Sequence, residues 1–235
     1  KENGNLIIGT GSVNIVDGKN INIKGNNVRY NRLNQIVEID GNVIFFDKEK
    51  NSEIKSNKVI FNRKLNILSS YGNTKLSLFD SGNSNIEFEI VGENTILDRN
   101  KKTLEIAKNV ILKNLINNYK IMSEKIIYNQ FEEIFKSFND TKINYQDKYL
   151  ILTKNISYNK KENFILSNNQ TSISDKFQNK FKLSNFNFDL NKKIFKANDI
   201  KLLDSENNLL ELTNGYINID TNELVGSDFN FKFNK

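Results

Sequence analysis

Short apolar runs recur along this chain, and each of the clearest ends at an Asn or Asp followed by polar residues. We name these end residues anchors; they are Asn31, Asn62, Asp98, Asn129, Asn159, Asp189 and Asp220. Successive anchors lie 31, 36, 31, 30, 30 and 31 residues apart. Such near-constant spacing is typical of a tandem repeat in which each copy is one supersecondary unit.

Each repeat reads as a strand, a short turn and a second strand. Asn and Asp favour turns because their side chains hydrogen-bond the backbone a few residues on. Alternating apolar residues resume after each turn, as they do in β-hairpins. Seven hairpins predict an all-β chain of about fourteen strands. Since composition does not shift along the chain and no linker interrupts it, we expect one domain over residues 1–235.

One column of apolar residues keeps the same register in every hairpin. Its members are separated by even steps, so they share one face of a pleated strand. The predicted inward-facing set is Val28, Tyr30, Val37, Ile39, Val43, Phe45, Val59, Phe61, Leu68, Leu76, Leu97, Leu104, Val110, Leu112, Ile126, Tyr128, Phe135, Ile143, Ile156, Tyr158, Ile165, Ile173, Phe186, Phe188, Phe195, Ile217 and Ile219. Stacked hairpins would align these columns into an apolar trough, which either side chains fill or a ligand enters.

Polar pairs interrupt the second strand of several repeats at its middle. Gly41-Asn42 and Gly72-Asn73 are the clearest, and Asn109, Asn139-Asp140 and Asn168-Asn169 occupy similar places. A glycine within a strand pattern is typical of a bulge or bend. The strands are therefore expected to turn a corner there, so that the sheet either closes into a barrel or folds into two facing sheets.

Composition removes most catalytic chemistry. The sequence contains no His, Cys, Pro or Trp. It therefore lacks the residues for a Ser-His-Asp triad, a thiol nucleophile or a thiolate or imidazole metal site. The adjacent Glu132 and Glu133 fall in a predicted turn. We expect no enzyme activity, no metal and no cofactor.

Charge does not indicate a nucleic-acid partner. The formal charge is +6, from 34 basic and 28 acidic residues mixed along the chain, whereas nucleic-acid binders gather basic residues on one face. No apolar stretch is long enough for a membrane-spanning helix. The first residues lack the pattern of a secretion signal, so we expect either a cytoplasmic protein or a mature fragment.

The repeat resembles a known family. The segment from Val28-Arg29-Tyr30-Asn31 to Ile39-Asp40-Gly41-Asn42-Val43 is similar to the OstA-like repeat of lipopolysaccharide-transport proteins. The resemblance extends over residues 9–233. Seven repeats and a final strand at 228–233 favour the amino-terminal periplasmic domain of LptD, and the lack of cysteine keeps LptA as the alternative.

The resemblance implies a fold and a role. The fold is an antiparallel β-jellyroll, a folded-over "β-taco". The implied role is a non-catalytic conduit that receives lipopolysaccharide in the apolar trough and passes it toward outer-membrane insertion. It also implies a periplasmic location associated with the outer membrane, a barrel beyond residue 235, and an outer-membrane lipoprotein plug that contacts that barrel.

A second partner is expected at the first strand. Unpaired strand edges recruit further strands, and the resemblance implies another β-jellyroll protein of the LptA type. The edge residues expected to take part are Ile7, Val13 and Ile15. A structural or adhesive β-solenoid without a lipid ligand is the alternative from a different functional class.

Overall fold

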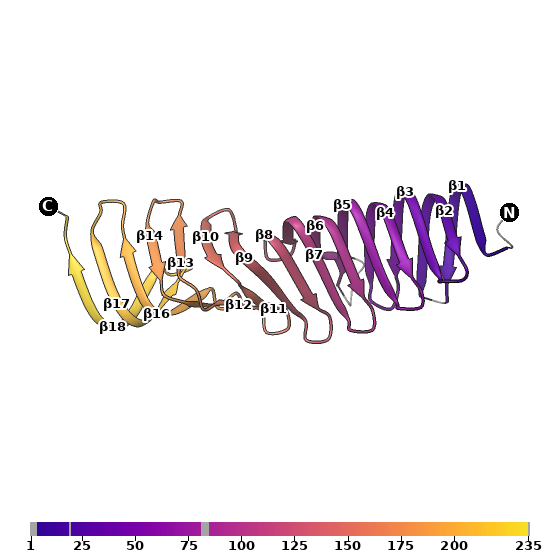
Figure 1. Ribbon diagram of the computed structural model, residues 1–235. Coiled ribbons are helices and arrows are strands. Elements are labelled where there is room, and N and C mark those ends of the chain that lie inside the picture. The colour runs from indigo at the N-terminus through magenta and orange to yellow at the C-terminus, as the bar shows by residue number, and fades with distance from the viewer. Residues whose placement is uncertain (1–3, 19, 81–84, 235) are drawn as a thin grey trace. The chain divides into compact units, whose positions relative to one another are not determined.

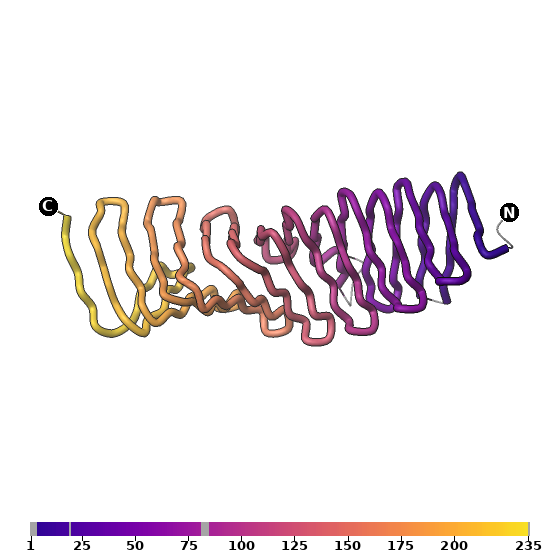
Figure 2. The backbone as a smooth tube through the Cα atoms, viewed as in Figure 1, coloured from indigo at the N-terminus to yellow at the C-terminus, as the bar shows by residue number. Residues whose placement is uncertain are grey.

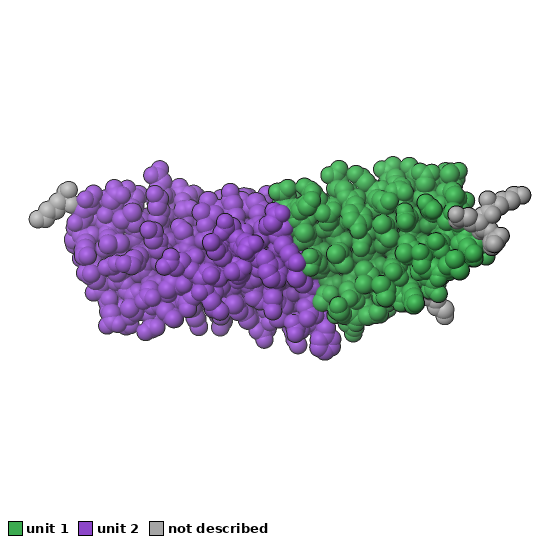
Figure 3. Space-filling view, in the orientation of Figure 1, with its two compact units in different colours: residues 1–117 green, residues 118–235 purple. Residues whose placement is uncertain are grey.

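The computed structural model describes residues 4–18, 20–80 and 85–234, and within these ranges the regular structure is all strand (Figure 1). The expected fold class is confirmed: the chain is an antiparallel all-β jellyroll. Its residues gather into two compact units, unit 1 over residues 1–117 and unit 2 over residues 118–235 (Figure 3). A single domain over the whole chain stays a prediction, and each unit is described by itself.

Unit 1 is built from long strands that pair antiparallel in chain order. Consecutive strands pair from β1 to β7, and most of these pairs shift register once near the middle. The strands are β1 (Leu6–Asp17), β2 (Ile21–Asn31), β3 (Ile36–Asp47), β4 (Ser52–Asn62), β5 (Ile67–Phe79), β6 (Ile86–Asp98) and β7 (Thr103–Asn114).

Unit 2 follows the same plan with shorter pieces. Its strands are β8 (Tyr119–Asn129), β9 (Ile134–Tyr145), β10 (Tyr149–Lys154), β11 (Ser157–Asn159), β12 (Phe164–Ser167), β13 (Thr171–Asp175), β14 (Lys180–Leu183), β15 (Phe186–Asp189), β16 (Ile194–Leu203), β17 (Leu209–Asn218) and β18 (Glu223–Lys232). The breaks between β10 and β11, β12 and β13, and β14 and β15 interrupt three strands that run unbroken in unit 1. Figure 2 shows the chain changing direction in this orange segment.

The strand count differs from the expected fourteen for two reasons. The described residues form 18 strands. One of the additional strands is β1, which precedes the first hairpin, and the other three come from the interrupted strands of unit 2. The hairpin repeat itself is as predicted.

The anchors build one repeated turn. In the first six turns the anchor's side-chain oxygen accepts a backbone N–H two or three residues on, as Asn31 does from Leu33 at 3.0 Å and Asp189 from Lys192 at 2.9 Å. The fourth residue after each of these anchors, and Asn222 in the seventh turn, has a left-handed φ between 56° and 58°. These residues are Gln35, Asn66, Lys102, Glu133, Asn163, Lys193 and Asn222. The turn, rather than glycine, therefore imposes this conformation.

The seventh anchor is Asn218 rather than Asp220. β17 ends at Asn218, whose Oδ1 accepts the N–H of Asp220 at 3.0 Å. Counting from Asn218 places the left-handed residue at Asn222, as in the other six turns. Asn218 and Asp220 are both possible anchors in the segment 217–220. With Asn218 as the anchor, Ile217 pairs with Leu224. Ile219 therefore lies in the turn and not on the inward face of a strand.

The corners lie where the sequence predicts them. Gly41 and Asn42 both have positive φ, and the pairing of β3 with β4 skips between Asp40 and Val43. Gly72 and Asn73 repeat this geometry in β5. In unit 2, Asn139 has positive φ, and the segment from Ser167 to Thr171 is one of the strand breaks. Each strand thus has two arms, one ending at an anchor turn and the other at the turn of the opposite end, here named a far turn.

Candidate functional site

The predicted inward column forms the interior of both units. In unit 1 the buried members are Val37, Ile39, Val43, Phe45, Val59, Phe61, Leu68, Leu76, Leu97, Leu104, Val110 and Leu112. In unit 2 they are Ile126, Tyr128, Phe135, Ile143, Ile156, Tyr158, Ile165, Ile173, Phe186, Phe188, Phe195 and Ile217. Val28, Tyr30 and Ile219 are half-buried. The burial shows where these side chains lie, while their contact with lipid stays a prediction.

Side chains from the two arms meet inside each unit. Phe45 and Phe61 make an edge contact with ring centroids 6.5 Å apart in unit 1. In unit 2, Phe188 stacks on Phe195 at 3.8 Å and meets the edge of Tyr145 at 5.0 Å. Phe45 and Phe188 are both fully buried. The middle of each trough is therefore filled by the protein's own side chains.

Hydroxyl groups line the inside of the corners. This set, the hydroxyl crease, consists of Ser56, Ser70 and Thr74 in unit 1 and Ser137, Thr141, Thr153, Ser167 and Thr171 in unit 2. The Ser56 hydroxyl donates to the carbonyl of Tyr71 at 2.9 Å. Ser167 donates to the carbonyl of Lys154 at 2.8 Å. The crease satisfies backbone groups that the bend removes from the strand ladder.

The opening of unit 1 between its row of anchor turns and its row of far turns is here named the mouth. Two arginines bridge this mouth. Arg63, in an anchor turn, binds Asp17 at the end of β1 through Nη2 and Oδ1 at 2.9 Å and through Nε and Oδ2 at 3.2 Å. Arg99, in the next anchor turn, binds Asp47 at the end of β3 through Nη2 and Oδ2 at 3.0 Å. Both pairs join the two arms, and we name them the mouth ties.

The two mouth ties differ in exposure. The Asp47 side chain is only 1% exposed and that of Arg99 19%, whereas Asp17 and Arg63 are 28% and 41% exposed. The hydrogen bonds to Asp17 and Tyr30 raise the pKa of Arg63 further above its ordinary value. Sequence analysis missed these ties, although arginine follows each of the first three anchors and the whole chain has only four arginines.

A small apolar cavity lies beside the Arg63–Asp17 tie. It has a volume of about 260 Å³. It is lined by Ile7, Ile15, Val16, Asp17, Ile23, Val28, Tyr30, Val37, Phe61 and Arg63, so both arms contribute to it. Two of the three predicted edge residues, Ile7 and Ile15, thus also line the trough. Ile7 is 42% exposed, and Val13 and Ile15 are half-buried.

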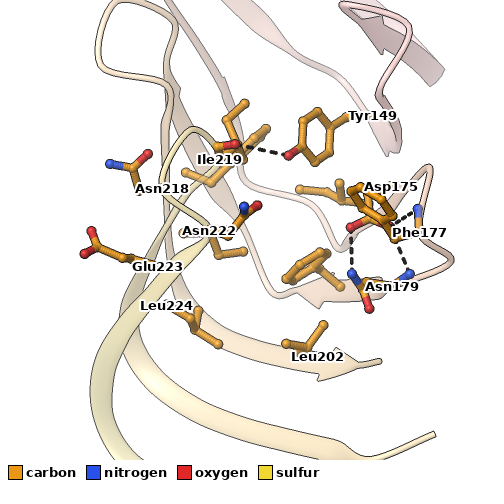
Figure 4. Close-up of a pocket in the computed structure, with 14 residues that line it drawn as sticks. Tyr149, Asp175, Phe177, Asn179, Leu202, Asn218, Ile219, Asn222, Glu223 and Leu224 are labelled. Atoms are coloured by element: carbon orange, nitrogen blue, oxygen red, sulfur yellow. Dashed lines mark hydrogen bonds between the residues drawn. The ribbon is translucent and has the colours of Figure 1, made fainter. Parts of the chain in front are cut away.

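The mouth of unit 2 is held by a different contact. The Tyr149 hydroxyl donates to the carbonyl of Ile219 at 3.3 Å, which joins a far turn to an anchor turn (Figure 4). Burial, with the carboxylates Asp175 and Asp220 nearby, raises the pKa of Tyr149. Burial also raises the pKa of Tyr145 to about 12. Both phenols are therefore neutral at physiological pH and available as hydrogen-bond donors.

A second apolar cavity lies behind that contact. Its volume is about 230 Å³. Its apolar lining is Ile173, Phe177, Phe181, Leu202, Phe195, Ile217, Ile219 and Leu224. Asp175 lies at its rim and accepts N–H groups of Phe177 and Asn179 at 2.8 and 3.0 Å (Figure 4). Among the described residues, then, each unit has an apolar cavity that reaches its mouth.

Other kinds of site find little support. In the part of the chain that the structure describes, no group of three or more His, Cys, Asp or Glu side chains could hold a metal. None of the described elements is a helix long and apolar enough to cross a bilayer.

Comparison with known proteins finds likenesses among solved structures but not among sequences. No family model and no curated protein matches the sequence. The chain is similar to the crystal structure of LptH, the LptA-homologous periplasmic component of the lipopolysaccharide transport device of Pseudomonas aeruginosa. The match has a TM-score of 0.45 and 12% sequence identity, and it covers 50% of this chain and 81% of LptH.

Proposed function

We propose that this chain is a non-catalytic lipid conduit that takes the acyl chains of lipopolysaccharide between the arms of its trough. The main observation that supports this proposal is the apolar column, which continues through every repeat and faces the interior of both units. Each methylene removed from water contributes about 0.8 kcal/mol, so successive similar positions hold an acyl chain while letting it move along the trough. The sugars stay in water.

The resemblance to the OstA-like repeat supports a place for this conduit. The expected location is the periplasm, with lipopolysaccharide passing toward outer-membrane insertion. The chain would act as the periplasmic domain of LptD, joined to a barrel and through it to a lipoprotein plug, or else as an LptA-like bridge. Sequencing the coding region beyond residue 235 separates these two, because a long barrel-forming segment is expected only for LptD.

A second candidate is a structural stack with no ligand, which the filled interior favours. Phe45, Phe188 and their neighbours pack against one another, and the apolar cavities at the two mouths are only about 260 and 230 Å³. A lipid conduit must therefore let the arms separate, whereas a structural stack need not. This difference makes the two candidates separable by experiment.

Site-specific photo-crosslinking in cells tests the conduit. A photoreactive residue at Leu202, which lines the cavity of unit 2, should yield lipopolysaccharide adducts. The outward neighbour Lys201 is the matched control and should yield few. Equal yields at inward and outward positions would favour the structural stack.

We also propose that β1 accepts a strand from another β-jellyroll protein. β1 pairs with β2 through residues 6–17, and its side chains Ile8 and Val16 are 66% and 63% exposed. Ile8 suits a test better than Val16, Ile7 or Ile15, because those three side chains also line the cavity. Ile8→Lys should abolish capture of an LptA-like partner and leave lipopolysaccharide adducts at Leu202 unchanged. Undiminished capture would contradict edge pairing.

A further inference from the structure

The mouth ties follow a rule of position that also applies in unit 2. In unit 1 the residue after an anchor forms an ion pair with the last residue of the strand that lies three strands earlier. Arg63, in the turn after β4, pairs with the end of β1. Arg99, in the turn after β6, pairs with the end of β3. When the interrupted strands of unit 2 are counted as single strands, the same step leads from Ile219 to Asp175. The acid is present there, and the arginine position holds isoleucine.

Both mouths have a cavity, but the cavity of unit 1 has the Arg63–Asp17 ion pair on its lining, whereas the cavity of unit 2 has Asp175 with Ile219 in the arginine position. Ile219 and Asp175 both line the 230 Å³ space at the mouth of unit 2. The contact across this mouth is a neutral hydrogen bond from the Tyr149 hydroxyl to the Ile219 carbonyl at 3.3 Å, which is longer than usual for an O–H···O bond. Separating it exposes no charge. Separating Arg99 from Asp47 would instead leave a buried carboxylate without its cation.

The shape of the unit 2 mouth suits an amphiphile. Behind Ile219 the lining is apolar, with Phe181, Leu202 and Leu224 on it. A neighbouring polar pocket of about 180 Å³ shares Tyr149, Asp175, Phe177, Ile219 and Asn222 with the cavity. Lys148 and Lys176 also line this pocket. The first space has room for part of one acyl chain, and the second has room for a small polar group attached to it.

We propose that the mouth ties keep unit 1 shut to lipid and that the mouth of unit 2 beneath Ile219 is the port where an acyl chain enters. This inference rests on the proposed conduit function and names its entry site. The volume fits part of one acyl chain rather than a whole multi-chain lipid. Chains therefore enter singly, and the arms separate further as more chain follows.

Introducing the missing tie tests the port. The full chain with Ile219→Arg should gain an ion pair to Asp175 and bind cis-parinaric acid, a fatty acid whose chain fluoresces on leaving water, about tenfold more weakly than the wild type. Adding Asp175→Asn removes the anionic partner and should restore part of the affinity. Ile116→Arg, the same change at a 64% exposed turn residue, is the matched control and should bind as the wild type does.

Removing a tie tests the closed unit. Arg63→Gln lies at the more exposed tie, so the fold tolerates it, and it should add a binding site for cis-parinaric acid in unit 1. Full binding by the Ile219→Arg variant, or an unchanged number of sites in Arg63→Gln, would overturn the port and leave the conduit intact. Lack of any binding by the wild type would overturn the conduit and the port together.

Discussion

Units 1 and 2 use one repeat to make two different structures. In both units the fourth residue after each anchor has a left-handed φ. Within each unit, consecutive anchor turns are joined by the same backbone hydrogen bond, as from Arg63 N–H to Gln35 O and from Leu190 N–H to Asn163 O. Unit 1 keeps its strands unbroken and ties its arms with arginine. Unit 2 interrupts three strands and leaves its mouth untied. The turns thus fix the repeat, while the corners and mouths are free to differ.

The interrupted strands of unit 2 are stabilised by side chains. The Ile156 N–H donates to Ser137 Oγ at 3.1 Å, and Asn169 Nδ2 donates to the Lys154 carbonyl at 3.1 Å. Unit 1 instead turns its corners on Gly41 and Gly72, which accept positive φ without a side-chain clash. We therefore expect unit 2 to lose more stability than unit 1 when a side chain at one of its corners is removed.

The largest expected effect concerns the buried aromatic rings that both units contain. Phe45→Ala in unit 1 and Phe188→Ala in unit 2 each remove a fully buried ring and should each lower the free energy of unfolding by about 4 kcal/mol. Urea denaturation measures both. Phe131→Ala, at a 78% exposed ring, should cost far less. A small loss at only one of the buried sites would show that one interior is loosely packed.

The next effect concerns the mouth of unit 1. Arg99→Gln leaves the buried Asp47 without its cation and should lower the free energy of unfolding by about 3 kcal/mol, near the lower end for a broken buried pair. Arg63→Gln breaks a more exposed tie and should cost about 0.5 kcal/mol. Arg32→Gln, in an exposed position of the first anchor turn, is the control for both. Equal losses at Arg99 and Arg32 would contradict a structural role for the tie.

A smaller effect separates the two kinds of corner. Ser137→Ala in unit 2 leaves the Ile156 N–H without its acceptor and should cost about 2 kcal/mol. Ser70, at the same register in unit 1, bonds Thr74 at 2.9 Å, and Ser70→Ala should cost about 1 kcal/mol. Thermal unfolding of the two variants compares them directly. If Ser70→Ala cost more, unit 1 would be the one that depends on its corner side chains.

The smallest effect is a pH dependence on the outer face of unit 1. Hydrogen bonds from Lys75 and Lys113 hold the pKa of Glu89 below its ordinary value of 4.5. A lowered pKa means that Glu89 stabilises the fold at neutral pH and that this contribution disappears as the pH falls below 4.5. Glu89→Gln should therefore cost about 0.5 kcal/mol at pH 7 and nothing at pH 3. A loss that persisted at pH 3 would assign the effect to packing.

Sequence predicts the repeat well because its signals are local. An anchor and its turn lie within five residues, so Asn31 and Asp189 could be recognised from their neighbours alone. The column from Val37 to Phe45 follows from the two-residue period of a strand. The Gly41-Asn42 pair located a corner for the same reason. The shift from Asp220 to Asn218 arose where two candidate anchors stood two residues apart.

The mouth contacts could not be predicted in the same way. Arg63 and Asp17 are 46 residues apart in sequence, and Arg99 and Asp47 are 52 apart. Periodicity assigns a residue to a face but does not say which residue of the opposite arm it meets. The cavity behind Ile219 depends on the same cross-arm register. The absence of arginine there has meaning only once the ties of unit 1 are known.

The stacked anchor turns have a consequence for how such a chain can change over evolutionary time. Within each unit, every anchor turn after the first bonds to its predecessor through the same two backbone atoms, so a duplicated or deleted hairpin meets its new neighbour through groups that every copy already has. Half a hairpin would reverse strand direction and separate each tie from its acid. The length of the chain can therefore change in steps of about thirty residues, because each added or removed hairpin meets its neighbours through the same backbone contact.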